Sequence, residues 1–241
     1  MSLGTVRSTV EGMATFLLVH GGFCDSWVWR DTAAALRASG DDVHVVDLPS
    51  SGKAAAGLGD LEADSAVVRR ALADLDEVVL VGHSGGGMAL AELADHPKVR
   101  HSVYLAALWP QKGQSAADLL GGQMPDWIVV RDAGAVQVSD DIELARQALC
   151  ADVAADRFSR EVHPRYLLTS MSGLTAASSG PVRAHAATYV ICEQDQAIPV
   201  VAQEAMGSAF DRVERLPSSH SPMLSMPGRL AEVLHDVGSS A

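Results

Sequence analysis

The sequence predicts one α/β domain, in which a mostly parallel six-stranded sheet is flanked by helices. Its 241 residues fit a single domain of this class. Hydrophobic residues make up 48% of the chain and charged residues 20%, which is ample material for a core. Short aliphatic runs alternate with longer segments of helical apolar spacing, and this alternation is typical of parallel strands joined by helices.

Each expected element has its own pattern. The strands are short runs such as TFLLV at 15–19 and VVLV at 78–81, which are nearly continuous in apolar residues, as expected when both faces are covered. The helices repeat apolar residues every three or four positions. In chain order we expect a strand at 15–19, a helix at 27–38, a strand at 43–47, a helix at 61–75, a strand at 78–81, a helix at 86–94, strands at 102–106 and 188–192, a helix at 200–210, a strand at 212–216 and a helix at 227–237.

The alternation lapses at 109–183, where four prolines interrupt mixed helical pieces. Loops longer than about 15 residues in a compact domain are usually functional lids, so we expect a cap here, inserted before the strand at 188–192. The alternative is an ordinary irregular connection. The core would then comprise 14–108 and 184–241, and residues 1–13, which carry little pattern, would be an N-terminal extension.

Charge and composition exclude several classes of protein. A net charge of −12 disfavours nucleic acid as a partner, because nucleic-acid binding depends on Lys and Arg neutralising phosphates. No run approaches the roughly 18 apolar residues that a membrane span needs, so no membrane association is expected. The three cysteines lack close spacing, which favours a reduced, cytoplasmic setting. The oligomeric state is left open, with a homodimer as one alternative.

No cofactor or metal is expected. The glycines at 82–87 follow G-x-x-G-G-G, whereas dinucleotide binding needs G-x-G-x-x-G. None of the nine histidines has the spacing of a metal-ligand motif. The remaining candidates for chemistry are a serine, a histidine and an aspartate.

Ser84 is the candidate nucleophile. The segment GHSGG at 82–86 fits G-x-S-x-G, in which small residues let a strand turn sharply into a helix and hold the serine exposed at the turn. The pattern alone is weak, and a plain glycine-rich turn is the alternative. A buried-type strand runs straight into it and a helix follows, which is the context that a nucleophile requires.

A serine hydroxyl needs a base, and the base needs an acid that fixes its orientation. His220 lies in a polar loop after the last strand and is the candidate base, although an exposed loop histidine is the alternative. Asp195 follows the strand at 188–192 and is the candidate acid. Glu193 is its nearest rival, and Asp47 ends a strand but precedes Ser84 in the chain.

Backbone N–H groups should stabilise the oxyanion that forms on the substrate. Gly85, directly after the nucleophile, and Gly22, in the loop after the first strand, are the candidate oxyanion-hole donors. His20 is expected to be a structural hydrogen-bonding residue in that loop. His83 could line the site or be structural, and the four tryptophans are more often core than substrate contacts.

Four segments resemble one known family: HGG at 20–22, GHSGGGM at 82–88, VICEQD at 190–195 and HSPML at 220–224. Together they are similar to the plant methylesterase and hydroxynitrile lyase family of α/β-hydrolases, over residues 14–237. The resemblance implies the α/β-hydrolase fold, no cofactor, and action on small esters or cyanohydrins. Lyases of this family carry a threonine where Gly21 stands and a lysine where Ser221 stands, so both departures favour ester hydrolysis. Ser219 stands where many relatives have aspartate.

The leading hypothesis is therefore a serine esterase that cleaves a small carboxylic ester, a small-molecule substrate, through an acyl-enzyme with Ser84, His220 and Asp195. A second hypothesis is a lyase or a biosynthetic cyclase that uses the same pocket. A third is a non-catalytic protein that binds a small molecule on the hydrolase fold, since fold alone does not fix function.

Overall fold

A six-stranded parallel sheet forms the centre of the molecule in the computed structural model, which describes residues 13–131 and 134–241. Its strand order is β10-β9-β5-β4-β1-β2, and every neighbouring pair is parallel, so the predicted fold class is confirmed. The strands are β1 (Thr15–Val19), β2 (Asp42–Val46), β4 (Val78–His83), β5 (Val99–Leu105), β9 (Ala186–Cys192) and β10 (Arg212–Leu216).

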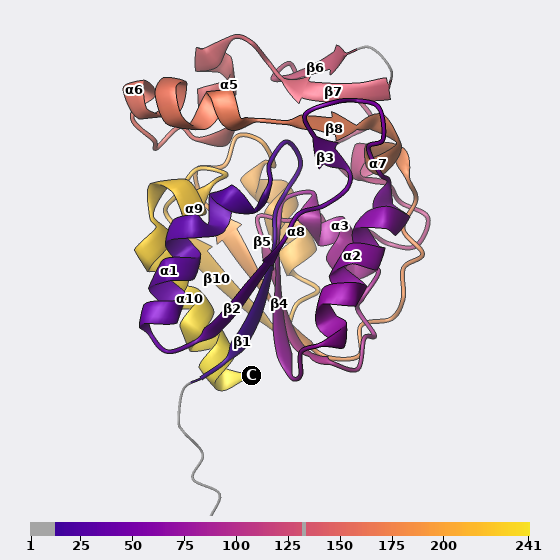
Figure 1. Cartoon of the computed structure of the whole chain (residues 1–241), viewed down its shortest axis with the longest axis vertical. Coiled ribbons are helices and arrows are strands. Elements are labelled where there is room, and N and C mark those ends of the chain that lie inside the picture. Colours follow the sequence, from indigo (N-terminus) through magenta and orange to yellow (C-terminus); the bar gives the residue numbers. More distant parts are fainter. Residues whose placement is uncertain (1–12, 132–133) are drawn as a thin grey trace, which may run out of the picture.

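Helices cover both faces of this sheet (Figure 1). The 3₁₀ turn η1 (Ser26–Trp29), α1 (Arg30–Ala38) and α10 (Pro227–Ser240) lie on one face. On the other lie α2 (Leu61–Ala73), α3 (Gly86–Ala91) and α8 (Val200–Gly207). In β1, Phe16 and Leu18 face the first layer, while Leu17 and Val19 face the second. This period of two, with apolar residues on both faces, explains why the strand sequences are continuously apolar.

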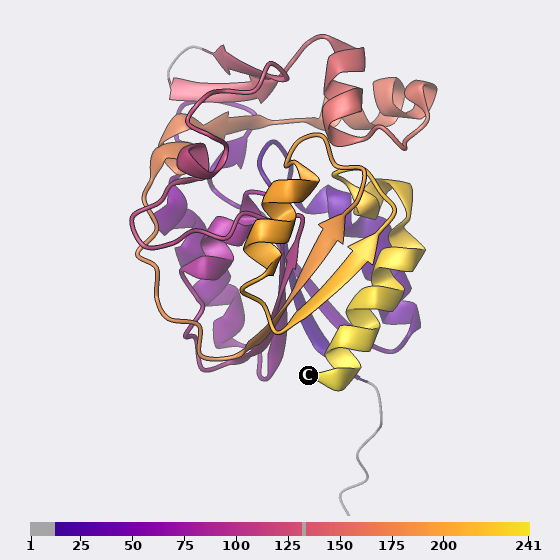
Figure 2. The ribbon, with the colours of Figure 1, turned by 180° about the vertical axis from the view of Figure 1, so that it is seen from behind.

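Segment 109–183 lies across the carboxyl ends of the main strands, and the arrowheads of β9 and β10 point toward it (Figure 2). The sequence indicated only helical pieces here, but the segment also supplies three strands of a four-stranded antiparallel sheet, in the order β3-β8-β7-β6. The remaining strand, β3 (Ser51–Gly52), comes from residues before 109. In chain order, the elements of segment 109–183 are α4 (Ala116–Leu119), β6 (Ile128–Arg131), β7 (Ala135–Val138), α5 (Ile142–Leu149), α6 (Ala155–Arg157), the π turn η3 (Phe158–Val162), the 3₁₀ turn η4 (His163–Arg165), β8 (Leu168–Ser170) and α7 (Met171–Thr175).

Some bounds differ from those expected. Strand β5 begins at Val99, three residues early, because the polar Arg100 and His101 interrupt the apolar pattern. Val99 and His101 nevertheless pair with β4, with a shift of register between them. A short helix, α9 (Pro222–Ser225), was not expected before α10. Of the predicted N-terminal extension, only Met13 belongs to the described residues, where it is exposed.

Within residues 13–131 and 134–241, none of the helices has both the length and the apolar character that crossing a bilayer would require.

Candidate active site

Four loops that carry the predicted site residues meet at the carboxyl edge of the main sheet. The strand register aligns their ends: Val19 is level with Gly82, and Leu216 with Cys192. The loop after β1 holds Gly22, the turn after β4 holds Ser84, and the loops after β9 and β10 hold Asp195 and His220. Parallel strands bring these residues together because all their carboxyl ends lie on one side.

Ser84 occupies the turn between β4 and α3 in a left-handed conformation, with φ +52°. Few residues other than glycine adopt this conformation, and such residues cluster at functional sites. The turn is held by three backbone hydrogen bonds: the Ser84 N–H donates to Leu105, and the Ser84 carbonyl accepts from Gly87 and Leu108. A Cβ at Gly86 would lie 2.4 Å from the His20 carbonyl oxygen, so only glycine fits there.

His220 and Asp195 form a buried pair. The His220 Nδ1 lies 2.7 Å from Asp195 Oδ2, and both side chains are almost fully buried. A carboxylate can only accept, so Nδ1 donates in this contact, and the other ring nitrogen, Nε2, takes no part in it. Both Ser84 and His220 line the same cavity. Among the described residues, the Ser84 hydroxyl makes no hydrogen bond to His220, which is common before a substrate is bound.

Asp195 is itself held by three further donors. The N–H groups of Ala197 and Ile198 donate to Oδ1 at 2.7 and 3.0 Å, and the Gln203 amide donates to Oδ2 at 2.8 Å. Gln203 is fully buried on α8 and also accepts from the Cys192 N–H. Gln203 was not among the residues predicted from the sequence, although a glutamine on the apolar, sheet-facing side of a helix is a signal that could indicate it.

The two predicted oxyanion-hole donors lie side by side. A Cβ placed on Gly85 would be 3.5 Å from the Gly22 nitrogen. In the described part of the chain, neither N–H has an acceptor. The next amide along, that of Phe23, donates to Thr169 Oγ1 at 2.7 Å, so it is already occupied.

Two other histidines, His20 and His83, lie beside this site and form hydrogen bonds to backbone groups. His20 Nδ1 lies 2.7 Å from the Gly21 carbonyl and Nε2 accepts from the Leu48 N–H, so both ring nitrogens are used, as expected of a structural residue. His83 Nε2 lies 2.9 Å from the His220 carbonyl oxygen and donates to it. Burial lowers the pKa of His20 and holds the pKa of His83 well below the usual range, so both rings are neutral.

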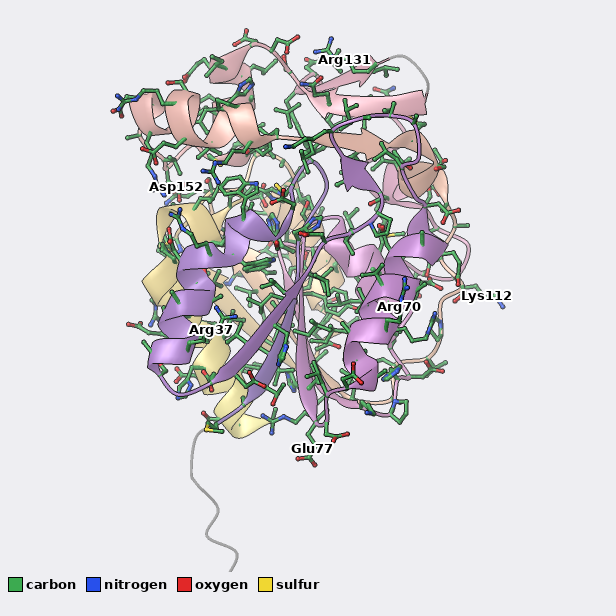
Figure 3. The ribbon with its side chains drawn as sticks, in the orientation of Figure 1. Arg37, Arg70, Glu77, Lys112, Arg131 and Asp152 are labelled. Atoms are coloured by element: carbon green, nitrogen blue, oxygen red, sulfur yellow. The ribbon has the colours of Figure 1, made fainter. Side chains whose placement is uncertain are left out.

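The loop that carries His220 is anchored from the segment above it. Asp152 accepts from the Ser219 N–H at 3.0 Å and from the Ser219 hydroxyl. In Figure 3, Asp152 is labelled between two parts of the molecule: the helices of segment 109–183 above it, and helices α1 and α9 of the core below it. Ser219 stands where the resembling family often has aspartate, and here the carboxylate comes from a residue 67 positions away. No pattern in the sequence indicates this contact.

A largely apolar cavity opens over Ser84 and encloses about 630 Å³, counting its open mouth. Segment 109–183 contributes much of its wall. Among the described residues, those that line it include no Lys, Arg, Asp or Glu. They are Gly22, Phe23, Cys24, His83, Ser84, Gly85, Leu108, Ala116, Leu120, Trp127, Ile128, Leu149, Tyr166, Leu174, Ala197, Ile198, His220 and Ser221.

Glu193 and Asp47, the alternatives to Asp195 as the acid, make other contacts. Glu193 is half-exposed and pairs with Arg215 at 3.7 Å. Asp47 accepts from the Ser26 N–H at 2.6 Å and does not reach His220. Of the four tryptophans, Trp127 alone is among the cavity residues; Trp109, for example, packs on Tyr104 and Phe210.

This fold and this arrangement of loops define a class of enzyme, the α/β-hydrolases. Residues 16–233 match the alpha/beta hydrolase family, and the chain therefore belongs to that family.

Several relatives make the resemblance more specific. The chain is 32% identical over 243 residues to the carbendazim hydrolyzing esterase of Nocardioides sp. strain SG-4G, covering 94% of this chain and all of the relative. It is 27% identical to Methylesterase 7 of Arabidopsis thaliana, covering 92% of this chain and 95% of that one. The crystal structure of a pyrethroid hydrolase from Sphingobium faniae JZ-2 superposes with a TM-score of 0.80 at 26% identity, covering 95% and 98%.

These comparisons confirm the resemblance to plant methylesterases and the prediction of an enzyme. The chain is a carboxylic ester hydrolase on the α/β-hydrolase fold.

Proposed function

We propose that this protein is a serine esterase whose triad is Ser84, His220 and Asp195, and that it acts through an acyl-enzyme. The observation that carries the proposal is the buried pair of His220 and Asp195, in which the His220 Nδ1 contacts the carboxylate, together with the cavity that both His220 and Ser84 line. Asp195 is held by three other donors, so it acts by orienting the imidazole and stabilising its charge.

The reaction follows from this geometry. The Ser84 Oγ attacks the ester carbonyl carbon while His220 Nε2 takes the hydroxyl proton, and the carbonyl oxygen becomes an oxyanion that accepts from the Gly22 and Gly85 N–H groups. The C–O bond to the alcohol then breaks, and the alcohol leaves with the proton from His220. Water attacks the acyl-enzyme with His220 again as the base, which releases the acid and restores Ser84.

The part of the ester substrate that suits the main cavity is small, uncharged and apolar. Because no charged side chain is among the residues of its wall, an ionic group there would lose its hydration without gaining a partner. Aliphatic and aromatic side chains such as Leu120, Trp127 and Leu174 offer apolar contact.

Gly21 supports ester hydrolysis over the lyase alternative. A Cβ at this position would lie 2.8 Å from Ser84 Cβ and 3.1 Å from His83 Nδ1. The threonine of the resembling lyases would therefore not fit here without displacing the nucleophile.

The direct test is Ser84→Ala, assayed with short-chain p-nitrophenyl esters. Loss of the nucleophile should lower kcat by about 10³-fold or more. A fluorophosphonate probe should label the native protein at Ser84 and leave the variant unlabelled. Turnover that persists unchanged in Ser84→Ala would reject the proposal, and micromolar ligand binding without labelling would support the non-catalytic alternative.

A further inference from the structure

A second, smaller cavity adjoins the main one at the predicted oxyanion hole. It encloses about 370 Å³, counting its open mouth. Four residues line both cavities: Gly22, Gly85, Ala116 and Leu174. Two of these four residues are glycines, so at Gly22 and Gly85 the two cavities share only backbone atoms as a wall.

The smaller cavity contains a carboxylate that the proposed mechanism does not use. Asp64 lies in the first turn of α2 and is 7% exposed. Among the described residues its hydrogen-bond partner is Ser50, whose N–H donates to Oδ1 at 2.8 Å and whose side chain also contacts the carboxylate. None of the ion pairs in the described part of the chain includes it.

A buried carboxylate without a cation is costly, so its presence calls for an explanation. Burial is the main reason that the pKa of Asp64 is raised to about 6, and Asp60 adds to it, while the Ser50 hydrogen bonds act in the opposite direction. Above that pH the group is an anion that faces the cavity with few donors. A ligand that brings a donor would relieve this cost.

The other polar groups of this cavity fit the same ligand chemistry. Thr169 Oγ1 accepts the Phe23 N–H and lies 3.5 Å from where a Gly22 Cβ would be, so it stands next to the oxyanion loop. The rest of the wall is apolar and includes Leu48, Leu61 and Met88. The N-terminal end of α2 lies close to α7 (Figure 1), and residues of α2, α7 and β8 line this cavity.

We propose that this smaller cavity, the Asp64 arm, binds a hydrogen-bond donor carried by the ester substrate, an amine or a hydroxyl group. The substrate would then place its reacting carbonyl at Ser84, its apolar portion in the main cavity and its donor against Asp64. This inference rests on the proposed function, because it describes the substrate of the same site. It narrows the substrate class from any small ester to esters that carry a hydrogen-bond donor on the acyl or the alcohol portion.

The test compares esters that differ only in the donor. Methyl 3-aminopropanoate is matched by methyl butanoate, which places the donor on the acyl side, and 2-hydroxyethyl butanoate is matched by propyl butanoate, which places it on the alcohol side. At pH 8 Asp64 is ionised.

Within each pair, the ratio of kcat/KM with the donor to kcat/KM without it cancels general losses of activity. Asp64→Asn should lower this ratio about tenfold or more for at least one pair, because a hydrogen bond to a charged group is lost.

Asp41→Asn is the matched control. Asp41 is 5% exposed, accepts from the Ala14 N–H at 3.0 Å and contacts His235, and it lines neither cavity. It should leave both ratios unchanged. The inference would be overturned if Asp64→Asn left both kcat/KM ratios unchanged. It would also be overturned if Asp41→Asn lowered the ratios as much as Asp64→Asn does.

Ser84→Ala separates this inference from the proposed function. If it abolishes turnover of all four esters while Asp64→Asn leaves both ratios intact, the triad stands and the Asp64 arm is rejected. If turnover survives Ser84→Ala, the proposed function itself fails.

Discussion

Three histidines that lie close to one another near Ser84 have different surroundings because their hydrogen-bond partners differ. His20 uses both ring nitrogens on backbone groups, and His83 donates to the carbonyl of His220. His220 has a carboxylate on Nδ1, its Nε2 makes no hydrogen bond to any described residue, and the residue lines the cavity. Burial keeps the pKa of His20 and of His83 low, so neither ring adds a positive charge beside His220.

Asp152 is a positioning residue for His220, and this role can be tested. Asp152→Ala removes both acceptors of Ser219, so the loop that holds His220 should loosen. We expect kcat to fall about tenfold with little change in KM, because the base is misplaced while the apolar cavity is intact. Steady-state kinetics on a p-nitrophenyl ester would measure this.

Asp156→Ala is the control for that variant. Asp156 is also an exposed aspartate of segment 109–183, but its carboxylate pairs with Arg160 and not with the His220 loop. It should leave kcat unchanged. An equal loss of kcat in both variants would show that Asp152 has no special role.

The turn between β4 and α3 shows how an element, rather than one residue, creates the site. Its strand contributes a fully buried run, its helix begins at Gly86, and the strained Ser84 lies between them. Close approach of the His20 carbonyl requires that residue 86 have no side chain. The packing on both sides of the turn holds the serine in its strained conformation.

Gly86→Ala should therefore both destabilise the protein and reduce its activity. The added Cβ meets backbone 2.4 Å away, which can be relieved only by moving the turn. We expect a loss of about 1–3 kcal/mol in the free energy of unfolding, the usual cost of overpacking, together with a lower kcat. Urea unfolding and ester kinetics would measure the two effects.

Gly228→Ala is the control for that element. Nothing lies within 4 Å of a Cβ at this position, in the first turn of α10. Because alanine favours helices over glycine, the change should be neutral or slightly stabilising. Activity that survives Gly86→Ala at the native level would contradict the expected role of the turn.

At the scale of the whole molecule, buried neutral histidines make stability depend on pH. His101 connects β5 to β9, with Nε2 2.9 Å from Thr188 Oγ1, while its Nδ1 is buried without a partner among the described residues. Burial, together with the nearby His185, lowers the pKa of His101 to about 4. Protonation would therefore place an unpaired charge inside the sheet.

The sign of the effect follows from the direction of that shift. An unfolded histidine binds a proton near pH 6.5, whereas the folded one does so near pH 4. Between these values the unfolded state binds more protons, so stability falls as the pH falls. His101→Gln cannot be protonated and should show a smaller loss of unfolding free energy between pH 7 and pH 5, measured by urea titration. His44→Gln, where the side chain is partly exposed and lies beside Asp42, controls for the loss of a histidine. An equal slope in His101→Gln and the native protein would refute the expectation.

The sequence by itself determined the central sheet, its helices and the turn that holds Ser84, because these depend on local periodicity and on glycines close together in the chain. It also indicated Asp195 and His220, since each follows a strand whose carboxyl end must lie at the same edge of the sheet. Only the tertiary structure decided the antiparallel sheet above that edge, where strands of two to four residues leave no readable pattern. The same holds for Asp152 and the Asp64 arm: each depends on residues distant in the chain that meet only when the chain folds, and one sequence carries no record of such contacts.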